Sequence, residues 1–175
     1  MAKVDRPFTV DLRGLSEGRH ELTLVEPGSS LDLPEDELCI EGDVTLDLVL
    51  SLTGRVITAR GTVRAEPEMT CARCLEPFTG ELEASFDVVL RAAEGGIELE
   101  DEEDTPAVLG EDWVAFDLSV REALLLAVPM KPLCRPDCQG LCPRCGTNLN
   151  ESTCDCAPEP ADPRWEDLRS LLEEQ

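Results

Sequence analysis

Hydrophobic and polar residues alternate along the first half of the chain. From Asp43 onward apolar residues fall at every second position, the period of a strand with one buried face; they are Val44, Leu46, Leu48, Leu50 and Leu52. The run from Val56 to Ala65 is similar, and the residues between the two runs, Thr53–Arg55, fit a turn. The pattern therefore predicts a long antiparallel hairpin.

Further alternating segments extend this prediction over the N-terminal half. Apolar residues recur at every second position from Leu82 to Leu90, which predicts a third strand of the same sheet. Shorter strands are expected from Phe8 to Leu12 and from His20 to Val25. We therefore expect an α+β fold, in which residues 1–91 form mainly an antiparallel β-sheet or a partly closed barrel.

Two short helices are predicted after these strands. Ser119 and Glu122 form an SxxE capping box and Pro129 stops the apolar run that follows, so this helix should pack on the sheet. Near the end of the chain, Asp162 and Pro163 supply an N-cap and a first-turn proline for a second helix. An apolar stripe on this helix either caps the core or docks on a partner; it consists of Trp165, Leu168, Leu171 and Leu172.

Acidic residues dominate the charge. The chain has 38 acids and 15 bases, a formal net charge of -23. The segment from Ala92 to Asp112 holds nine acids and no base, which predicts a mobile, solvated loop. The overall charge repels a phosphate backbone and favours contact with basic proteins.

The sequence shows no membrane span and no secretory signal. Its densest apolar run, from Ala123 to Val128, has six residues, far fewer than the roughly 18 that a span requires. We expect a cytoplasmic protein without membrane contact. Because a reducing cytoplasm keeps thiols free, the clustered, odd set of nine cysteines indicates metal ligands with one cysteine left over, rather than disulfides.

The strongest candidate chemistry lies near the C-terminus. The motif Cys142-Pro-Arg-Cys145-Gly is followed after a short gap by Cys154-Asp-Cys156. Zinc prefers tetrahedral thiolate coordination, a CPxCG turn directs two sulfurs to one point, and Gly146 tolerates the backbone of that turn. Residues at i and i+2 of an extended segment point to the same side. This spacing predicts a zinc site with four cysteine ligands.

Two more cysteine pairs each form half a site. Cys71 and Cys74 lie between predicted strands, whereas Cys134 and Cys138 follow the first predicted helix. Joining the pairs makes a second zinc site that ties the tail to the sheet. The alternative partition also fits the sequence; it groups Cys134, Cys138, Cys142 and Cys145 at one metal, and Cys71, Cys74, Cys154 and Cys156 at the other. Cys39 is expected to be a buried thiol outside both sites.

The predicted elements give five segments, which we expect to form one structural domain. They are a β region with a CxxC knuckle (1–91), an acidic loop (92–112), a helical region (113–130), a zinc ribbon (131–158) and an amphipathic helix (159–175). Each structural zinc contributes roughly 10–16 kcal/mol of apparent folding free energy at neutral pH. Two structural zinc ions are therefore expected to order the ribbon.

Common catalytic motifs are absent. The only histidine is His20, which we interpret as a surface or strand-edge residue, and the chain has no tyrosine and no GxSxG, GxGxxG or Walker pattern. A zinc ion held by four thiolates has no open position at which to activate water. We therefore expect a protein that is not an enzyme and has no small-molecule substrate.

Two stretches carry a motif that is specific in combination. One is CARCLEPF, from Cys71 to Phe78, and the other extends from Pro132 to Cys156 and contains PLC, CQGLCP, CG, NLN and CDC in order. Asp162-Pro-Arg follows before the last predicted helix. From about residue 68 onward the chain resembles the bacterial YceD family, the large ribosomal RNA subunit accumulation proteins. The resemblance implies a role in ribosome biogenesis that supports accumulation of large-subunit ribosomal RNA.

Two hypotheses about the partner follow. Two tetrathiolate zinc sites, each with a net charge of -2, would take the formal charge from -23 to -27. This charge favours an adaptor or assembly factor for a basic ribosomal or RNA-processing protein. The alternative is a zinc ribbon that binds ribosomal RNA directly, since Lys131, Arg135 and Arg144 make the ribbon the least acidic stretch.

Overall fold

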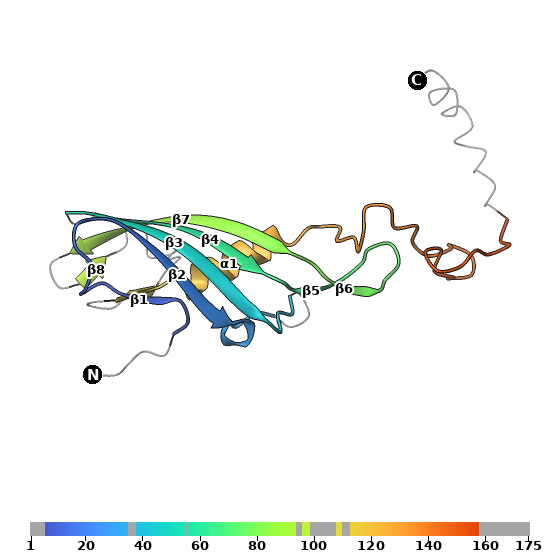
Figure 1. Ribbon diagram of the computed structural model, residues 1–175, viewed down its shortest axis with the longest axis horizontal. Coiled ribbons are helices and arrows are strands. Elements are labelled where there is room, and N and C mark those ends of the chain that lie inside the picture. Colours follow the sequence, from blue (N-terminus) through green and yellow to red (C-terminus); the bar gives the residue numbers. More distant parts are fainter. Residues whose placement is uncertain are drawn as a thin grey trace, which may run out of the picture.

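The computed structural model describes residues 6–34, 38–54, 56–93, 96–98, 108–109 and 113–157, with side chains described in these ranges except at 91–93, 96–98 and 108–109. Figure 1 shows an elongated molecule, with a twisted sheet and a helix at one end and a thin extension at the other. Most of the predicted acidic loop and the predicted helix over 159–175 lie outside the described residues.

A five-stranded antiparallel sheet is the largest element. Its strands, in spatial order, are β2 (Gly18–Pro27), β3 (Asp43–Thr53), β4 (Val56–Ala65), β7 (Leu82–Ala93) and β8 (Gly96–Glu98). The predicted hairpin is confirmed as β3 and β4, in which Leu48 pairs with Gly61. The predicted third strand is also confirmed, because β7 pairs with β4 and sets Phe86 opposite Gly61.

One face of this sheet and one helix enclose the core. The β3 residues Val44, Leu46, Leu48 and Leu50 are at most 1% exposed, as their alternation predicts. Helix α1 (Asp117–Ala127) packs on this sheet against β7 and β4. Phe116, just before the helix, stacks on Phe86 with ring centroids 6.0 Å apart. The Phe86 ring fills the space that a side chain at position 61 would need, which explains the glycine there.

Smaller elements complete the fold. β1 (Thr9–Asp11), β10 (Trp113–Ala115) and β9 (Val108–Leu109) form a three-stranded sheet, and a 3-10 turn, η1 (Gly28–Ser30), follows β2. β5 (Glu68–Thr70) and β6 (Pro77–Thr79) form a hairpin that extends past the end of the main sheet (Figure 1). We call this hairpin and its tip the arm; the chain that leaves α1 runs beside it.

The barrel alternative is wrong for the described strands. The main sheet is open, with β2 and β8 at its edges. The strand predicted at Phe8 to Leu12 does not join it, because β1 pairs with β10 instead. Closure is not needed to bury the apolar face, since α1 covers it. The opposite face is polar and carries exposed ion pairs, such as Arg60–Asp87 and Arg64–Asp47.

Three further predictions need correction. The capping box does not start α1: Ser119 lies inside the helix, 2% exposed, and the N-cap is Phe116, whose side chain makes no capping bond. Burial of Phe116 in the core fixes the start instead. The acidic segment is not wholly a loop, because β8 and β9 fall within it. Cys39 is exposed rather than buried. The edge-strand interpretation of His20 is confirmed, since it lies in β2.

Candidate metal centres

The arm brings together the two cysteine pairs that are distant in sequence. Cys71 and Cys74 occupy its tip, between β5 and β6, and Ala72 N–H donates to Pro132 O (2.8 Å) in the segment after α1. This contact aligns the following cysteines with the tip. Four sulfurs then lie within 4.8 Å of one another and form the first tetrad, which is Cys71, Cys74, Cys134 and Cys138.

The geometry of the first tetrad fits a metal ion. Cys71 Sγ lies 3.8 Å from Cys138 Sγ, and Cys74 Sγ lies 3.7 Å from Cys134 Sγ. A metal with four thiolates at about 2.3 Å has sulfurs about 3.8 Å apart along each tetrahedron edge. A disulfide would need about 2.05 Å. These thiols are therefore spaced as ligands of one ion.

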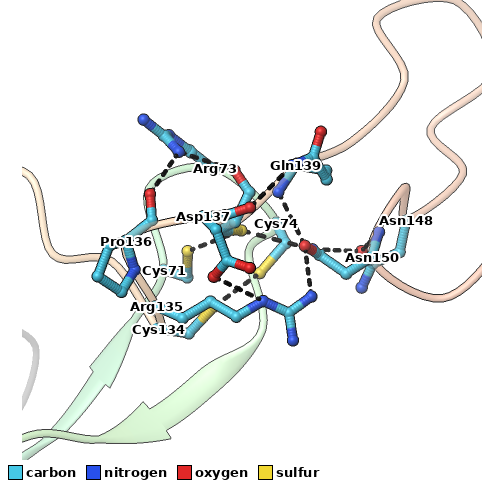
Figure 2. Close-up of polar contacts among 11 residues, drawn as sticks. Cys71, Arg73, Cys74, Cys134, Arg135, Pro136, Asp137, Gln139, Asn148 and Asn150 are labelled. Carbon is cyan, nitrogen blue, oxygen red and sulfur yellow. Dashed lines mark hydrogen bonds and ion pairs between the residues drawn. The ribbon is translucent and has the colours of Figure 1, made fainter.

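Hydrogen bonds between protein groups hold the two halves of the first tetrad together. Arg73 Nη1 donates to Pro136 O (3.3 Å), as Figure 2 shows, and to Cys138 O (2.8 Å). Leu141 N–H donates back to Arg73 O (3.1 Å). Gly140 lies against this arginine with φ +76°, and a Cβ there would be 3.0 Å from Arg73 O. Glycine is therefore required by both its backbone angle and the close approach.

The second tetrad is local in sequence. It consists of Cys142, Cys145, Cys154 and Cys156, whose sulfurs also lie within 4.8 Å of one another. Leu141 and Asn148 form an isolated bridge on either side of the Cys142–Cys145 knuckle. Cys145 and Cys156 are exposed, whereas Cys71, Cys74 and Cys138 of the first tetrad are at most 3% exposed. The two centres thus share ligand chemistry but differ in access to solvent.

The two CxxC knuckles have the same backbone turn. Leu75 N–H donates to Cys71 O and Gly146 N–H to Cys142 O, each at 2.9 Å. The residue after the second cysteine has positive φ in both, +60° at Leu75 and +73° at Gly146. This turn directs backbone N–H groups toward the sulfurs and explains why CxxC pairs act as half-sites.

Hydrogen bonds and burial shift the pKa values of the thiols within each tetrad in opposite directions. The backbone N–H groups of Cys134 and Cys74 lower the pKa of Cys71 to about 5, whereas burial raises the pKa of Cys134 to about 12. In the second tetrad the Thr147 hydroxyl, 3.1 Å from Cys145 Sγ, lowers the pKa of Cys145 to about 6. The neighbouring Cys145 raises the pKa of Cys156 to about 12. Four adjacent thiolates therefore need a cation to ionise together.

The structure decides between the two partitions that the sequence allowed. The four cysteines from 134 to 145 do not share one site. Instead, Cys134 and Cys138 lie with the cysteine pair of the arm, whereas Cys142 and Cys145 lie with the C-terminal pair. Sequence reasoning missed the polar residues around the sulfurs, namely Arg73, Thr147, Asn148 and Asn150. The available signals were the position of Arg73 between two ligands and the NLN motif, which contains Asn148 and Asn150.

Comparison with known proteins identifies the family. The family model YceD, described as large ribosomal RNA subunit accumulation protein YceD, matches residues 59–172. The chain belongs to the YceD family. The matched region contains all eight cysteines of the two tetrads.

Relatives of this YceD chain occur in bacteria and plants. An uncharacterized protein of Mycobacterium tuberculosis is 30% identical over 175 residues, covering 97% of this chain and 83% of the relative. A chloroplastic protein of Zea mays, named large ribosomal RNA subunit accumulation protein YCED homolog 1, is 31% identical over 126 residues, 56% of this chain and 43% of the relative. Its Arabidopsis thaliana namesake is 26% identical over 142 residues, 65% of this chain and 44% of the relative. No solved structure matches the chain.

Among the described residues, no helix has the length and apolar character needed to cross a bilayer. The helix α1, with 11 residues, is far shorter than the roughly 20 that a span requires.

Proposed function

We propose that this YceD chain is a non-enzymatic zinc-binding factor of ribosome biogenesis, which supports accumulation of large-subunit ribosomal RNA through a basic protein partner. The observation that carries the proposal is the pair of four-cysteine groups within a YceD chain. Four thiolates fill the coordination shell of zinc and leave no position for water, so the metal role is structural. The family name and those of the plant relatives indicate the process.

Surface charge supports a protein partner over bare RNA. Asp43, Glu66, Glu81 and Glu83 line a hollow of about 390 Å³ at the end of the main sheet, next to the arm. The arginine in that hollow, Arg64, already pairs with Asp47 and Glu83. A surface with excess carboxylates attracts basic side chains and repels phosphates.

The alternative, direct binding of ribosomal RNA, depends on the bases of the ribbon. Arg135 of the ribbon already donates to Asn150, and the nearby Arg73 of the arm already donates to backbone carbonyls. Lys131 and Arg144 are exposed. Two bases provide little counterion release, because each neutralised phosphate contributes only about one unit to the salt slope.

Metal content is the first test of the proposal. Protein purified without chelator is expected to carry two zinc ions by native mass spectrometry, one for each tetrad. Loss of the protein from cells is expected to lower large-subunit relative to small-subunit ribosomal RNA. Re-expression of the natural chain should restore the ratio, and a variant with both tetrads changed to serine should not. Metal-free protein with paired disulfides would overturn the zinc assignment.

Partner class is tested by binding at graded salt. Capture from a lysate followed by mass spectrometry is expected to yield a basic ribosomal or RNA-processing protein, whose binding weakens when the acids from Glu98 to Asp104 are neutralised. Gel shifts with ribosomal RNA fragments should show no appreciable affinity at physiological salt. Submicromolar RNA binding that disappears with Lys131→Ala and Arg144→Ala would favour the alternative; these residues avoid the structural role of Arg135.

A further inference from the structure

A short hairpin-like loop joins the two tetrads. Leu149 N–H donates to Gly140 O (2.9 Å), and Leu141 bridges Asn148, so residues 140–149 fold back on themselves. Leu141 N–H also donates to Arg73 O in the knuckle of the first tetrad. The loop carries Cys142 and Cys145 of the second tetrad. One small element therefore contacts one centre and supplies ligands to the other.

Asn150, at the end of this loop, reaches a sulfur of the first tetrad. Its Nδ2 donates to Cys138 Sγ (3.4 Å) and to Asn148 Oδ1 (2.8 Å). Its Oδ1 accepts from Gln139 N–H (2.8 Å) and from Arg135 Nη2 (2.7 Å) (Figure 2). Both ends of the amide are thus held, and the donor end is directed at a ligand atom.

Asn150 lies in the segment that joins the two cysteine pairs of the second tetrad. The residue lies between Cys145 and Cys154, inside a turn that is closed by the Glu151 and Ser152 N–H groups, which both donate to Asn148 O (3.1 Å). Binding of one ion by Cys142, Cys145, Cys154 and Cys156 would fix both ends of this segment. Without that ion only the hydrogen bonds of Asn148 and Asn150 would hold the segment in place.

An N–H···S bond from a fixed amide favours a thiolate ligand and orients it. Loss of such partners around a metal typically lowers metal affinity 10–100-fold. We propose that the two metal sites are coupled through Asn150: an ion in the second tetrad holds this amide against Cys138 and thereby strengthens metal binding by the first tetrad. By linkage, an ion in the first tetrad strengthens binding by the second to the same degree. This inference rests on the zinc binding proposed above.

The test measures zinc occupancy of each tetrad separately in the full chain. At graded free Zn²⁺, cysteines are alkylated and their protection is read by mass spectrometry. Asn150→Asp keeps the acceptor toward Gln139 and Arg135 but replaces the donor toward Cys138 with an oxygen. It should shift half-protection of the first tetrad to 10–100-fold higher free Zn²⁺. Gln139→Ala, which removes a side chain bonded to Asp137 O, is the matched control and should cause no shift.

A double-mutant cycle isolates the coupling. Cys142→Ser with Cys145→Ser disables the second tetrad and should also weaken the first. Adding Asn150→Ala to this background should then cause little further loss. Additive losses, or an unchanged first tetrad when the second is disabled, would overturn the coupling while leaving zinc binding intact. Absence of protection at every cysteine of the unmodified chain would instead overturn zinc binding itself, and the coupling with it.

A spectroscopic measurement separates the N–H···S bond from a general loss of fold. With Co²⁺ as the probe, Asn150→Ala should shift the sulfur-to-cobalt charge-transfer absorption to longer wavelength, because an unbonded sulfur lone pair is higher in energy. Gln139→Ala should leave the absorption in place. A spectrum of Asn150→Ala identical to that of the unmodified protein would show that the amide does not act on Cys138, and the proposal would fail.

Discussion

Each tetrad consists of four cysteine thiols, but the two tetrads differ in sequence separation and in burial. The first joins segments far apart in sequence, since Cys71 and Cys138 are 67 residues apart, and three of its cysteines are at most 3% exposed. The second closes over a loop within residues 142–156 and exposes Cys145 and Cys156. Ligand chemistry alone therefore does not determine what a centre does for the fold: one connects the ribbon to the arm, and the other shapes the ribbon locally.

The two tetrads also differ in the chain entropy that is lost when their loops close. Closing a long loop costs more chain entropy than closing a short one, although the cost grows only with the logarithm of length. The first tetrad is assisted by contacts of the protein itself, from Arg73 to Cys138 O and from Ala72 to Pro132 O. The second relies on a short loop and its knuckle. A metal at the first centre should thus control the position of the ribbon, and a metal at the second its internal structure.

The largest expected effect comes from removing one ligand of each centre. Cys138→Ser should release one ion and detach the ribbon from the arm, so the radius of gyration in small-angle scattering should increase. Cys145→Ser should also release one ion but leave the ribbon attached. Each ion represents roughly 10–16 kcal/mol of apparent folding free energy.

In both variants the main sheet should persist, because its core between β3 and α1 contains neither tetrad. Far-UV circular dichroism checks this. Collapse of the strand signal in either variant would show that the sheet depends on the metal centres. Equal dimensions for the two variants would remove the distinction between a connecting and a local centre.

A smaller effect is expected in the rate of metal release. A chelator reaches the exposed sulfurs of the second tetrad directly, whereas the buried first tetrad must open locally. Each 1.4 kcal/mol of opening free energy slows release about tenfold. Zinc transfer to a chromophoric chelator should therefore be biphasic, with phases separated by at least about tenfold, and Cys145→Ser should lack the fast phase. Loss of the slow phase instead would reverse the assignment.

Much of this architecture was accessible from sequence because it depends on local periods and spacings. Alternation predicted the burial of Val44 and Leu50, and the CxxC, CxxxC and CxC spacings identified eight cysteines as paired half-sites. The same alternation could also have predicted that Cys39 is exposed. Leu38 and Ile40 are 2% and 7% exposed, so the residue between them points to the other face.

Features set by tertiary contacts were not accessible. Whether the sheet closes depends on the partner of β1, which is β10, a strand about a hundred residues later. Which half-sites share an ion depends on the arm, whose short strands β5 and β6 carry little pattern of their own. The start of α1 depends on burial of Phe116 against Phe86. In each case a long-range contact outweighs a local signal.

The smallest predicted effect comes from exchanging the residue that follows the second cysteine of each knuckle. Leu75 and Gly146 occupy equivalent left-handed positions. A left-handed leucine is strained by roughly 1–2 kcal/mol. Glycine avoids this strain but destabilises the folded state by about 0.5–1 kcal/mol, because it makes the unfolded chain more flexible. The middle of these ranges leaves about 0.75 kcal/mol, so Leu75→Gly should strengthen the first tetrad slightly, by about three- to fourfold in zinc affinity. Gly146→Leu should weaken the second by a similar factor, since a Cβ there meets nothing within 4 Å and only strain remains.

Competition with a chelator of known affinity measures both changes, and Leu75→Ala provides the control. Alanine keeps the strained backbone but removes most of the side chain, which is 63% exposed and contributes little burial. It should leave the affinity of the first tetrad unchanged. If Leu75→Gly instead weakened the first tetrad while Leu75→Ala did not, the knuckle would need a restrained backbone more than a relaxed one. The buried centre would then owe part of its affinity to chain stiffness at Leu75, a contribution that Gly146 cannot supply to the exposed centre.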